Sequence, residues 1–570
     1  MSSSHKHTKD YSRNTRSAAV ALIVVLIVVS FIPPQSIGSI ELRRANILSD
    51  LVTFDDARER QALPDWDKEE DFYTDFSLLA EEVGDVGETA RSEVRAGVGT
   101  DFATPPAAPA FPTLSVSSAT SSASQVQTLF EWRVDADPAA AHSDDGERMP
   151  TLPDTFRPSG PVIPIEPFDS LRDDCFAAFC AKLLAARQPV RIAVLGDSFI
   201  EGDILTADLR ERLQETYGGG GTGFAPMASP LTAFRRTVKT TAKGWTSYNI
   251  MQRKKTPEHL RDKFYVSGWV CQPSAGASTR WEATTYRHKA DECTCGRIFF
   301  LAADSCRLEV TVNDSLHHEF TVEGDPSVRQ IAVRAPRIGS LSLRVAEGAG
   351  GFIGYGAVLE SDGLSVDNYS IRSNNGQAMF WTNPSIDAQV DAMLDYDLVV
   401  LQYGLNIMRG GVHNYTNYAA QIEKMVTFVR ECFPGAAVLV MGVSDRSVRT
   451  DAGFVPMSAV RSMTAYQRQA ARSVQAAFWP TADAMADLGG MSHFVRSGWA
   501  GKDHTHINYA GGRRIGHALF DALNDRIRAV YEVRRREIRY EPVQLDSLRR
   551  RQIERRLFIG PAPLKPTTQP

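Results

Sequence analysis

The sequence predicts an α/β fold, in which a parallel β-sheet is covered by helices on both faces and an antiparallel β-sandwich is inserted. The first observation is that short apolar runs alternate with segments of helical period, as in sheets that are buried on both faces. The second is that residues 236–365 carry strand-like runs with no helical period between them. The composition is that of a folded protein, because 43% of the 570 residues are hydrophobic.

A helix followed by a buried strand begins the folded region. Apolar residues from Phe168 to Leu184 recur at helical spacing, and the apolar run Val190–Leu195 follows and leads into Gly-Asp-Ser. Further elements come after the inserted region: strand 396–403 with helix 415–432, strand 437–442 with helix 458–478, and a closing helix 507–532. This alternation indicates parallel strands joined by helices.

The inserted region contains six runs that read as strands. They are GRIFFLAA, CRLEVTVND, HHEFTVEG, VRQIAVRA, LSLRVAEG and GFIGYGAVLE. Short strands separated by turn residues are typical of an antiparallel sandwich, and about 130 residues is an ordinary domain size. The predicted α/β domain is therefore split into residues 165–235 and 366–532 around the insert 236–365.

Four of the seven cysteines fall inside this insert, at Cys271, Cys293, Cys295 and Cys306. Their spacing lacks the paired CxxC motif of a structural zinc site. We therefore expect one or two local disulfides, whose pairing the sequence leaves open.

The N-terminal residues predict a membrane anchor. Residues 1–16 carry four Lys or Arg residues, residues 17–32 carry no charge, and Pro33-Pro34 follows. We expect a retained single-pass signal anchor with residues 1–16 in the cytoplasm and the remaining chain exported; a cleaved signal peptide is the alternative.

The segments that flank the predicted domains have low-complexity or highly charged compositions. Residues 33–164 are rich in Asp, Glu, Ala, Ser and Pro and predict a low-complexity tether, and residues 533–570 predict a charged tail. The net charge of −5 provides no overall positive field, so nucleic acid is not an expected partner.

Ser198 is a candidate nucleophile because it follows the first predicted strand, at the sheet edge where α/β proteins bind ligands. A helix cap is the alternative role for a serine at this place. The flanking residues do not form the Gly-x-Ser-x-Gly motif of the α/β-hydrolase nucleophile elbow.

A base for this serine is available in Asp503-His-Thr-His506, just before the closing helix. An Asp and a His three residues apart can lie on one side of a turn, where the carboxylate orients the imidazole and the imidazole accepts the serine proton. The alternatives are ordinary caps and turn residues, or a metal-binding pair formed by His504 and His506. No further cluster of ligands completes such a metal site in the sequence.

Asn406 follows the strand 396–403 in the segment Gly404-Leu-Asn406. It is therefore expected at the same sheet edge as Ser198, where its amide could donate a hydrogen bond to an oxyanion. A turn asparagine is the alternative.

The order of these motifs, Gly-Asp-Ser, then Gly-x-Asn, then Asp-x-x-His before the last helix, resembles the SGNH (GDSL-type) hydrolase superfamily over residues 165–235 and 366–530. The resemblance implies a flavodoxin-like sheet, with Ser198 as nucleophile, His506 as general base, Asp503 as its orienting acid and Asn406 as an oxyanion donor. Ser198 would also contribute its own backbone amide to the oxyanion hole.

Two positions depart from the pattern of this superfamily. Its remaining oxyanion element is a glycine in a segment like Asn-x-x-Ile-x-Gly, and Asn368-Tyr-Ser-Ile-Arg-Ser373 has serine in the glycine place, with Gly376 three residues later. The second amide is therefore assigned to Ser373 or Gly376. The superfamily commonly has Asp after the Asn, where this chain has Ile407.

An exported SGNH domain interrupted by a β-sandwich resembles bacterial peptidoglycan O-acetylesterases and related polysaccharide esterases, whose insert is similar to a carbohydrate-binding module. This resemblance implies a membrane-tethered esterase that acts on an acetylated cell-envelope glycan and needs neither metal nor cofactor. The alternatives are an O-acetyltransferase with the same triad and a non-catalytic glycan-binding or scaffold protein. The sequence leaves the glycan and the oligomeric state open.

Overall fold

The computed structural model describes residues 36–37, 40–41, 128–134, 158, 161–168, 173–185, 189–451 and 453–539. Within residues 1–74, which form a unit of their own, it describes the antiparallel pair β1 (Ser36–Ile37) and β2 (Ile40–Glu41). The predicted cytoplasmic segment 1–16 and anchor 17–32 lie outside the described residues. None of the helices in the described ranges is both long and apolar enough to cross a membrane.

A five-stranded parallel sheet forms the centre of the α/β part. Its strands lie in the order β14 (Leu364–Ser370), β4 (Val190–Gly196), β15 (Leu398–Gln402), β16 (Ala437–Met441) and β19 (Ala477–Trp479), and all neighbours are parallel. Every residue of β4, β15, β16 and β19 is buried, so both faces of the sheet are covered. This is the parallel sheet that the alternating pattern predicts.

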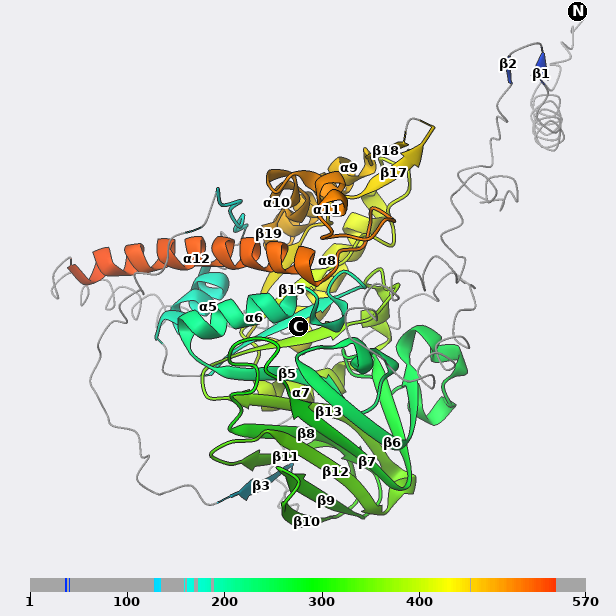
Figure 1. The fold of residues 1–570 in the computed structure, drawn as a ribbon, viewed down its shortest axis with the longest axis vertical. Helices are drawn as coiled ribbons and strands as arrows, with labels where there is room; N and C mark the ends of the chain where they lie inside the picture. The colour runs from blue at the N-terminus through cyan, green and yellow to red at the C-terminus, as the bar shows by residue number, and fades with distance from the viewer. Residues whose placement is uncertain are drawn as a thin grey trace, which may run out of the picture. The chain divides into compact units, whose positions relative to one another are not determined.

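The helices around this sheet form two packed groups. One group contains α5 (Asp173–Ala185), α6 (Thr206–Tyr217) and α12 (Tyr509–Arg539), which lie together in Figure 1. The other contains α7 (Pro384–Leu394), α8 (Thr416–Cys432) and α9 (Ala459–Ser473). Two short helices, α10 (Thr481–Asp487) and α11 (Gly490–Arg496), follow β19.

The strand β19 lies where the sequence pattern predicts the end of a helix. The helix predicted over 458–478 ends at Ser473, and the apolar residues that follow form β19. The apolar run Ala476–Trp479 continues the helical pattern of α9, so its composition alone gives no boundary. In the structure, β19 pairs with β16 and completes the buried edge of the sheet.

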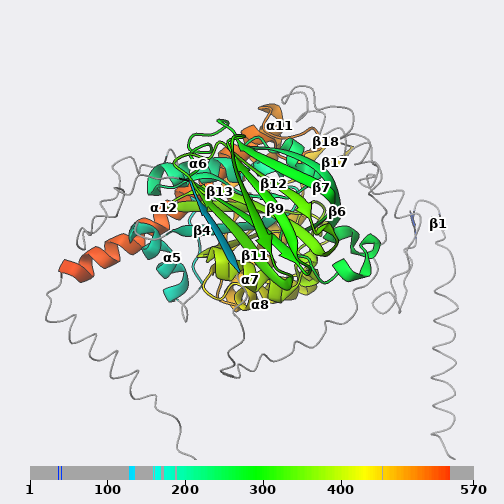
Figure 2. The ribbon, with the colours of Figure 1, turned by 90° about the horizontal axis from the view of Figure 1, so that it is seen from below.

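A second, ten-stranded sheet contains the strands predicted for the insert. Its members are β3 (Leu129–Arg133), β5 (Gly220–Pro226), β6 (Val238–Asn249), β7 (Trp269–Ala283), β8 (Cys295–Ala302), β9 (Cys306–Val312), β10 (Leu316–Val322), β11 (Asp325–Arg334), β12 (Ser340–Glu347) and β13 (Phe352–Ser361). Figure 2 shows β7, β12 and β9 side by side, as their pairing requires. The sheet is mixed, because β3 runs parallel to β11 while the other pairs are antiparallel.

The predicted antiparallel sandwich is not confirmed, because the strands are connected in one sheet. Two runs of strands, β6–β7–β12–β9–β10 and β5–β13–β8–β11–β3, are joined by a single residue pair, Gly354 with Cys271. Apolar side chains from both runs, such as Val310 and Ile298, share one buried cluster. An alternating strand pattern shows which face of a strand is buried, but it does not show with which strands that strand pairs.

Two strands join this sheet from outside the predicted insert. β3 lies within the segment 33–164 that was predicted as a tether, and it pairs with β11. β5 pairs with β13 and passes so close to β14 that a Cβ at Gly223, where φ is +68°, would lie 2.3 Å from Val366 O. The glycines of β5 therefore allow the two sheets to contact each other.

The expected disulfides are not formed by the cysteines that the structure describes. Cys180, Cys271, Cys293, Cys295, Cys306 and Cys432 are all buried free thiols. Cys271 instead donates to Ala228 O at 3.2 Å. Three of the four cysteines of the insert, Cys271, Cys293 and Cys306, lie in one buried apolar cluster, where a thiol packs as a small apolar side chain.

Two buried carboxyls make the stability of the fold depend on pH. Burial raises the pKa of Asp387 in α7 to about 8 and that of Asp197 to about 7. Both are then protonated in the folded chain at pH values where the unfolded chain is ionised. The free energy of unfolding should therefore fall as pH rises from about 5 to 7, by about 1.4 kcal/mol per pH unit for each such proton.

The variant Asp387→Asn should make this dependence shallower by about one proton. Its amide can keep both contacts of the native carboxyl: Oδ1 accepts from Val266 N at 2.9 Å, and Nδ2 can donate to Thr382 Oγ1, which also bonds Met379 O. Urea unfolding at pH 5, 6 and 7 would measure the pH dependence of the free energy of unfolding. The exposed Asp487→Asn is the matched control, and an unchanged slope in Asp387→Asn would contradict the assignment.

Candidate active site

Ser198 lies just beyond the carboxyl end of β4, which is an interior strand of the parallel sheet. β4 ends at Gly196, where a Cβ would lie 2.8 Å from Gln402 Oε1 and 2.9 Å from Gln402 O of β15. Glycine therefore lets the two strands stay paired up to this point. Asp197 is fully buried and Ser198 is half-buried, so the serine hydroxyl emerges at the edge where open α/β sheets bind ligands.

His506 and Asp503 meet Ser198 from a loop that directly precedes α12. His506 Nε2 lies 3.3 Å from Ser198 Oγ, and His506 Nδ1 lies 2.5 Å from Asp503 Oδ2. The other oxygen of Asp503 accepts the backbone N–H groups of Thr505 and His506 at 3.1 and 3.2 Å. This network favours a proton on Nδ1, which leaves Nε2 free to accept the proton of the serine hydroxyl.

Asp503 is held as an anion in this network. Burial alone would raise its pKa, but the hydrogen bond and the charge of His506, with the two backbone N–H groups, lower the pKa below its ordinary value. An ionised carboxylate at Nδ1 stabilises the imidazolium that forms when His506 takes up a proton.

Asn406 lies in the turn that follows β15. Its Nδ2 donates to Asp197 Oδ2 and to the backbone oxygen of Asn374, both at 3.0 Å. These two contacts fix the amide although Ile407 occupies the place where the superfamily commonly has Asp. The structure therefore places Asn406 beside the residue that precedes Ser198.

The loop after β14 carries the two candidates for the second oxyanion amide. Ile371 N donates to Gly196 O at 2.9 Å, so the loop starts level with the Gly-Asp-Ser turn. Ser373 is exposed with φ of +59°, and its N–H has no acceptor within the described part of the chain. Gly376 is buried, its N–H donates to Asn374 Oδ1 at 2.9 Å, and a Cβ there would lie 2.2 Å from Met425 Sδ of α8.

Asp197 and Asn374 belong to the site although the sequence did not single them out. Burial raises the pKa of Asp197 to about 7, while the bond from Phe199 N–H at 2.9 Å and the charge of His506 act in the opposite direction. Asp197 is adjacent to Ser198 in the sequence, which is a signal that could have marked it. Asn374 acts through its backbone oxygen, for which the sequence carries no signal.

The turn after Ser198 is fixed by ion pairs of two carboxylates, Glu201 and Asp203. Glu201 pairs with Arg372, whose Nε lies 3.0 Å from Oε2, and this pair ties the turn to the loop that carries Ser373. Asp203 accepts from Arg210 and Arg235 at 3.0 and 2.9 Å. Although burial opposes ionisation, these two guanidinium groups hold the pKa of Asp203 well below its usual range.

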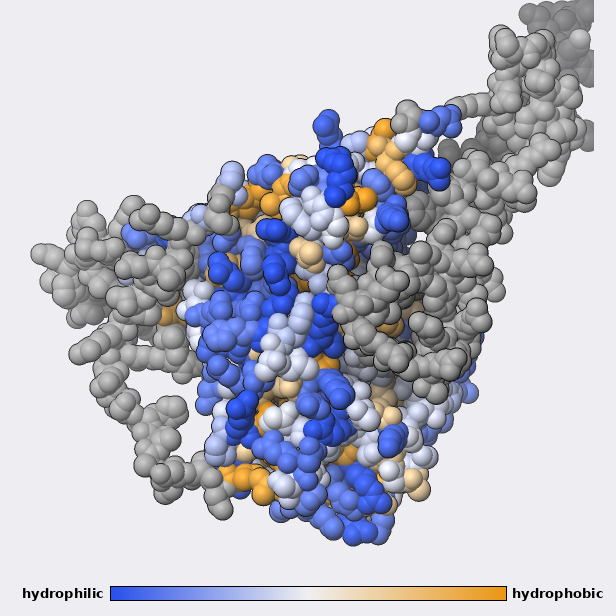
Figure 3. Space-filling model, viewed as in Figure 1, coloured by the Kyte–Doolittle hydropathy of each residue, from blue (hydrophilic) through white to orange (hydrophobic). Residues whose placement is uncertain are grey.

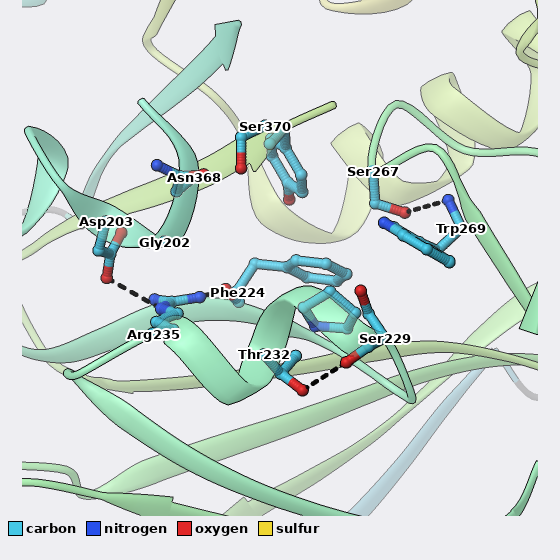
Figure 4. Close-up of a pocket in the computed structure, with 12 residues that line it drawn as sticks. Gly202, Asp203, Phe224, Ser229, Thr232, Arg235, Ser267, Trp269, Asn368 and Ser370 are labelled. Atoms are coloured by element: carbon cyan, nitrogen blue, oxygen red, sulfur yellow. Dashed lines mark hydrogen bonds and ion pairs between the residues drawn. The ribbon is translucent and has the colours of Figure 1, made fainter. Parts of the chain in front are cut away.

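A small cavity lies beside this turn, and Figure 4 shows Phe224, Trp269 and Ser370 among the residues that line it, with Arg235 reaching Asp203. The volume of the cavity is about 40 Å³. None of Ser198, Asp503 and His506 lines it. This volume is of the order needed for a few water molecules.

His504 is not part of a metal cluster in the described residues. Across the described ranges, no group of three or more His, Cys, Asp or Glu side chains could hold a metal ion. His504 instead stacks on Phe454, with ring centroids 3.7 Å apart and planes 9° apart.

The fold of this chain is similar to that of a solved peptidoglycan O-acetylesterase. The two are 21% identical with a TM-score of 0.52, and the alignment covers 64% of this chain and 99% of the esterase. The chain resembles the SGNH hydrolases in fold. No protein-family model and no curated protein sequence matches it.

Two other solved structures align with lower scores. The salicylyl-acyltransferase SsfX3 from a tetracycline biosynthetic pathway is 12% identical with a TM-score of 0.25, and the alignment covers 52% of this chain and 96% of that one. An acetyl xylan esterase is 14% identical with a TM-score of 0.22 and covers 28% and 81%. At these identities, the likeness to the peptidoglycan O-acetylesterase establishes the fold, and the chemistry depends on the side chains described above.

Proposed function

We propose that the protein is a membrane-tethered, exported serine esterase that removes O-acetyl groups from a cell-envelope glycan. The observation that carries the esterase chemistry is the chain of contacts from Ser198 Oγ to His506 Nε2 and from His506 Nδ1 to Asp503 Oδ2, at the carboxyl end of a parallel sheet. A hydroxyl, an imidazole and a carboxylate in this order form the activated nucleophile of acyl transfer.

In the proposed reaction, Ser198 Oγ attacks the acetyl carbonyl carbon while His506 Nε2 takes the hydroxyl proton. The tetrahedral intermediate collapses, the bond from carbon to the sugar oxygen breaks, and His506 returns its proton to that oxygen. Water then attacks the acetyl-serine with His506 as base, and acetate leaves as Ser198 regains its proton. Asp503 remains ionised throughout and stabilises the imidazolium.

The oxyanion of each tetrahedral intermediate would be held by the backbone amide of Ser198, the Nδ2 group of Asn406 and the backbone amide of Ser373. Ser373 is favoured over Gly376, because the Gly376 N–H already has an acceptor in Asn374. An oxyanion would compete with Asp197 and Asn374 for the two hydrogens on Asn406 Nδ2. One such donor is worth roughly 3 to 4 kcal/mol in acyl transfer.

The substrate class and the location are the further parts of the proposal. The fold likeness to a peptidoglycan O-acetylesterase supports an acetylated glycan as substrate. The basic segment 1–16 and the uncharged run 17–32 support export and a membrane anchor.

The test is acetate release from p-nitrophenyl acetate and from O-acetylated peptidoglycan and xylan by the purified full chain. We expect p-nitrophenol release that saturates with substrate, and free acetate from at least one acetylated glycan. Acetyl groups that move to an added sugar acceptor and do not appear as acetate would identify a transferase. No turnover of any acetyl ester would contradict the proposed chemistry.

A further inference from the structure

Exposed apolar side chains gather on the segments that border the triad. Among the described residues, the large hydrophobic side chains that are most exposed are Leu129, Leu316, Phe380, Val412, Phe454 and Val455. Phe454 and Val455 lie on the strand β18 (Gly453–Pro456), which pairs with β17 (Ser447–Thr450) in a hairpin. Val412 lies in the loop that follows β15 and also carries Asn406. Half of this set therefore belongs to two segments next to the candidate active site.

The hairpin is attached directly to the loop that carries the catalytic candidates. The ring of Phe454 stacks on His504, which lies between Asp503 and His506 in the chain. Ser447 N, at the start of β17, donates to His504 O at 3.1 Å. Burial lowers the pKa of His504, which favours its uncharged form, although the charge of Asp503 acts in the opposite direction. Phe454 is still 39% exposed in this position.

The loop that carries Val412 contacts α9, the helix that follows the hairpin in the chain. His413 Nδ1 lies 3.0 Å from Ser462 Oγ in α9, and Tyr415 packs edge-to-face on Tyr466 of that helix. α9 begins three residues after the hairpin ends. In Figure 1 the hairpin stands out from the helices at the upper right, and Figure 3 shows apolar surface over it.

We propose that the ring of Phe454 forms a platform on which a pyranose ring of the glycan stacks while a neighbouring sugar presents its acetyl group to Ser198. This inference rests on the proposed function and adds to it a binding subsite. An exposed aromatic side chain beside a ligand site supplies flat, rigid contact area for a ring of the ligand. The CH face of a pyranose is flat and uncharged, which matches a neutral stacked pair.

The position of the platform, beside the loop that carries His506, favours a sugar ring of the substrate as its ligand. His504 supports the ring of Phe454 and is two residues from His506 in the chain, so the platform is attached to the loop that carries the proposed base.

The experiment compares selectivity in variants. The measured quantity is the ratio of kcat/KM for acetylated chito- and xylo-oligosaccharides to kcat/KM for p-nitrophenyl acetate, which has no sugar ring. Phe454→Ala should lower this ratio roughly three- to tenfold, mainly through KM, as expected for the loss of one aromatic stacking contact. Phe454→Tyr should stay within about twofold of the wild type, because it keeps the ring. Leu316→Ala, at a similarly exposed position on β10, is the matched control and should keep the wild-type ratio.

Several outcomes would overturn the platform. A ratio that does not change in Phe454→Ala, or that falls equally in Leu316→Ala, would do so. If the wild type hydrolyses p-nitrophenyl acetate but none of the acetylated oligosaccharides, the platform is also excluded, but the proposed esterase chemistry is not. Dimerisation of the wild type that Phe454→Ala abolishes would assign the patch to a second copy of the chain. Absence of all esterase activity in the wild type would instead remove the proposed function itself.

Discussion

Replacing Ser198 with alanine should lower kcat/KM for p-nitrophenyl acetate by about four to six orders of magnitude, the range seen when a serine hydrolase loses its nucleophile. The physical reason is that no covalent acetyl intermediate can form without the hydroxyl. Ser198 is half-buried and its hydroxyl bonds His506 at 3.3 Å. The free energy of unfolding should therefore change by less than about 1 kcal/mol.

The matched control for this variant is Ser274→Ala. Ser274 is exposed and donates to Gly244 O at 2.9 Å in the second sheet, so the same chemical change is made outside the candidate site. A fluorophosphonate probe should label the wild type and Ser274→Ala once per chain and leave Ser198→Ala unlabelled. Turnover that persists in Ser198→Ala would show that another residue is the nucleophile.

The sequence predicted that Ser198, Asp503 and His506 lie close together because these residues lie at strand ends or in one short segment. A buried apolar run that leads into Gly-Asp-Ser must deliver its serine to the carboxyl edge of a parallel sheet, and the same holds for Asn406 after β15. His506 and Asp503 are three residues apart, so their contact is a local one. These features depend on short stretches of sequence and on a single sheet topology.

Features that depend on long-range pairing could not be predicted in this way. The sequence indicates that β5 is rich in glycine but does not show that it joins β13, and it gives no sign that β3 pairs with β11. The same limit applies to the site. Ile407 stands where the superfamily commonly has the Asp that follows the Asn. Asn406 is instead held by hydrogen bonds to Asp197 and Asn374, which are 209 and 32 positions away in the chain. Such contacts are set by packing and not by local pattern.

Asp503→Asn is the second substitution that we expect to cause a large loss of activity, because of the hydrogen bonds that Asp503 makes. In the native chain, Asp503 Oδ1 accepts two backbone N–H groups while Oδ2 lies 2.5 Å from His506 Nδ1. The asparagine can keep Oδ1 on those two N–H groups, which leaves its Nδ2 group facing the imidazole. Since Nδ2 is a donor, His506 Nδ1 must become the acceptor and the ring proton must move to Nε2.

A proton on Nε2 faces Ser198 Oγ, so the imidazole can no longer take the serine proton. We expect kcat to fall about 10⁴-fold at pH 7 with a small change in KM, since the wrong tautomer blocks the chemical step and leaves the binding surface in place. Fluorophosphonate labelling should slow in parallel. Asp487→Asn, an exposed site at the end of α10, is the control for the same substitution. A loss of less than about tenfold would mean that Asp503 does not orient His506, because correct tautomer selection alone accounts for a far larger factor.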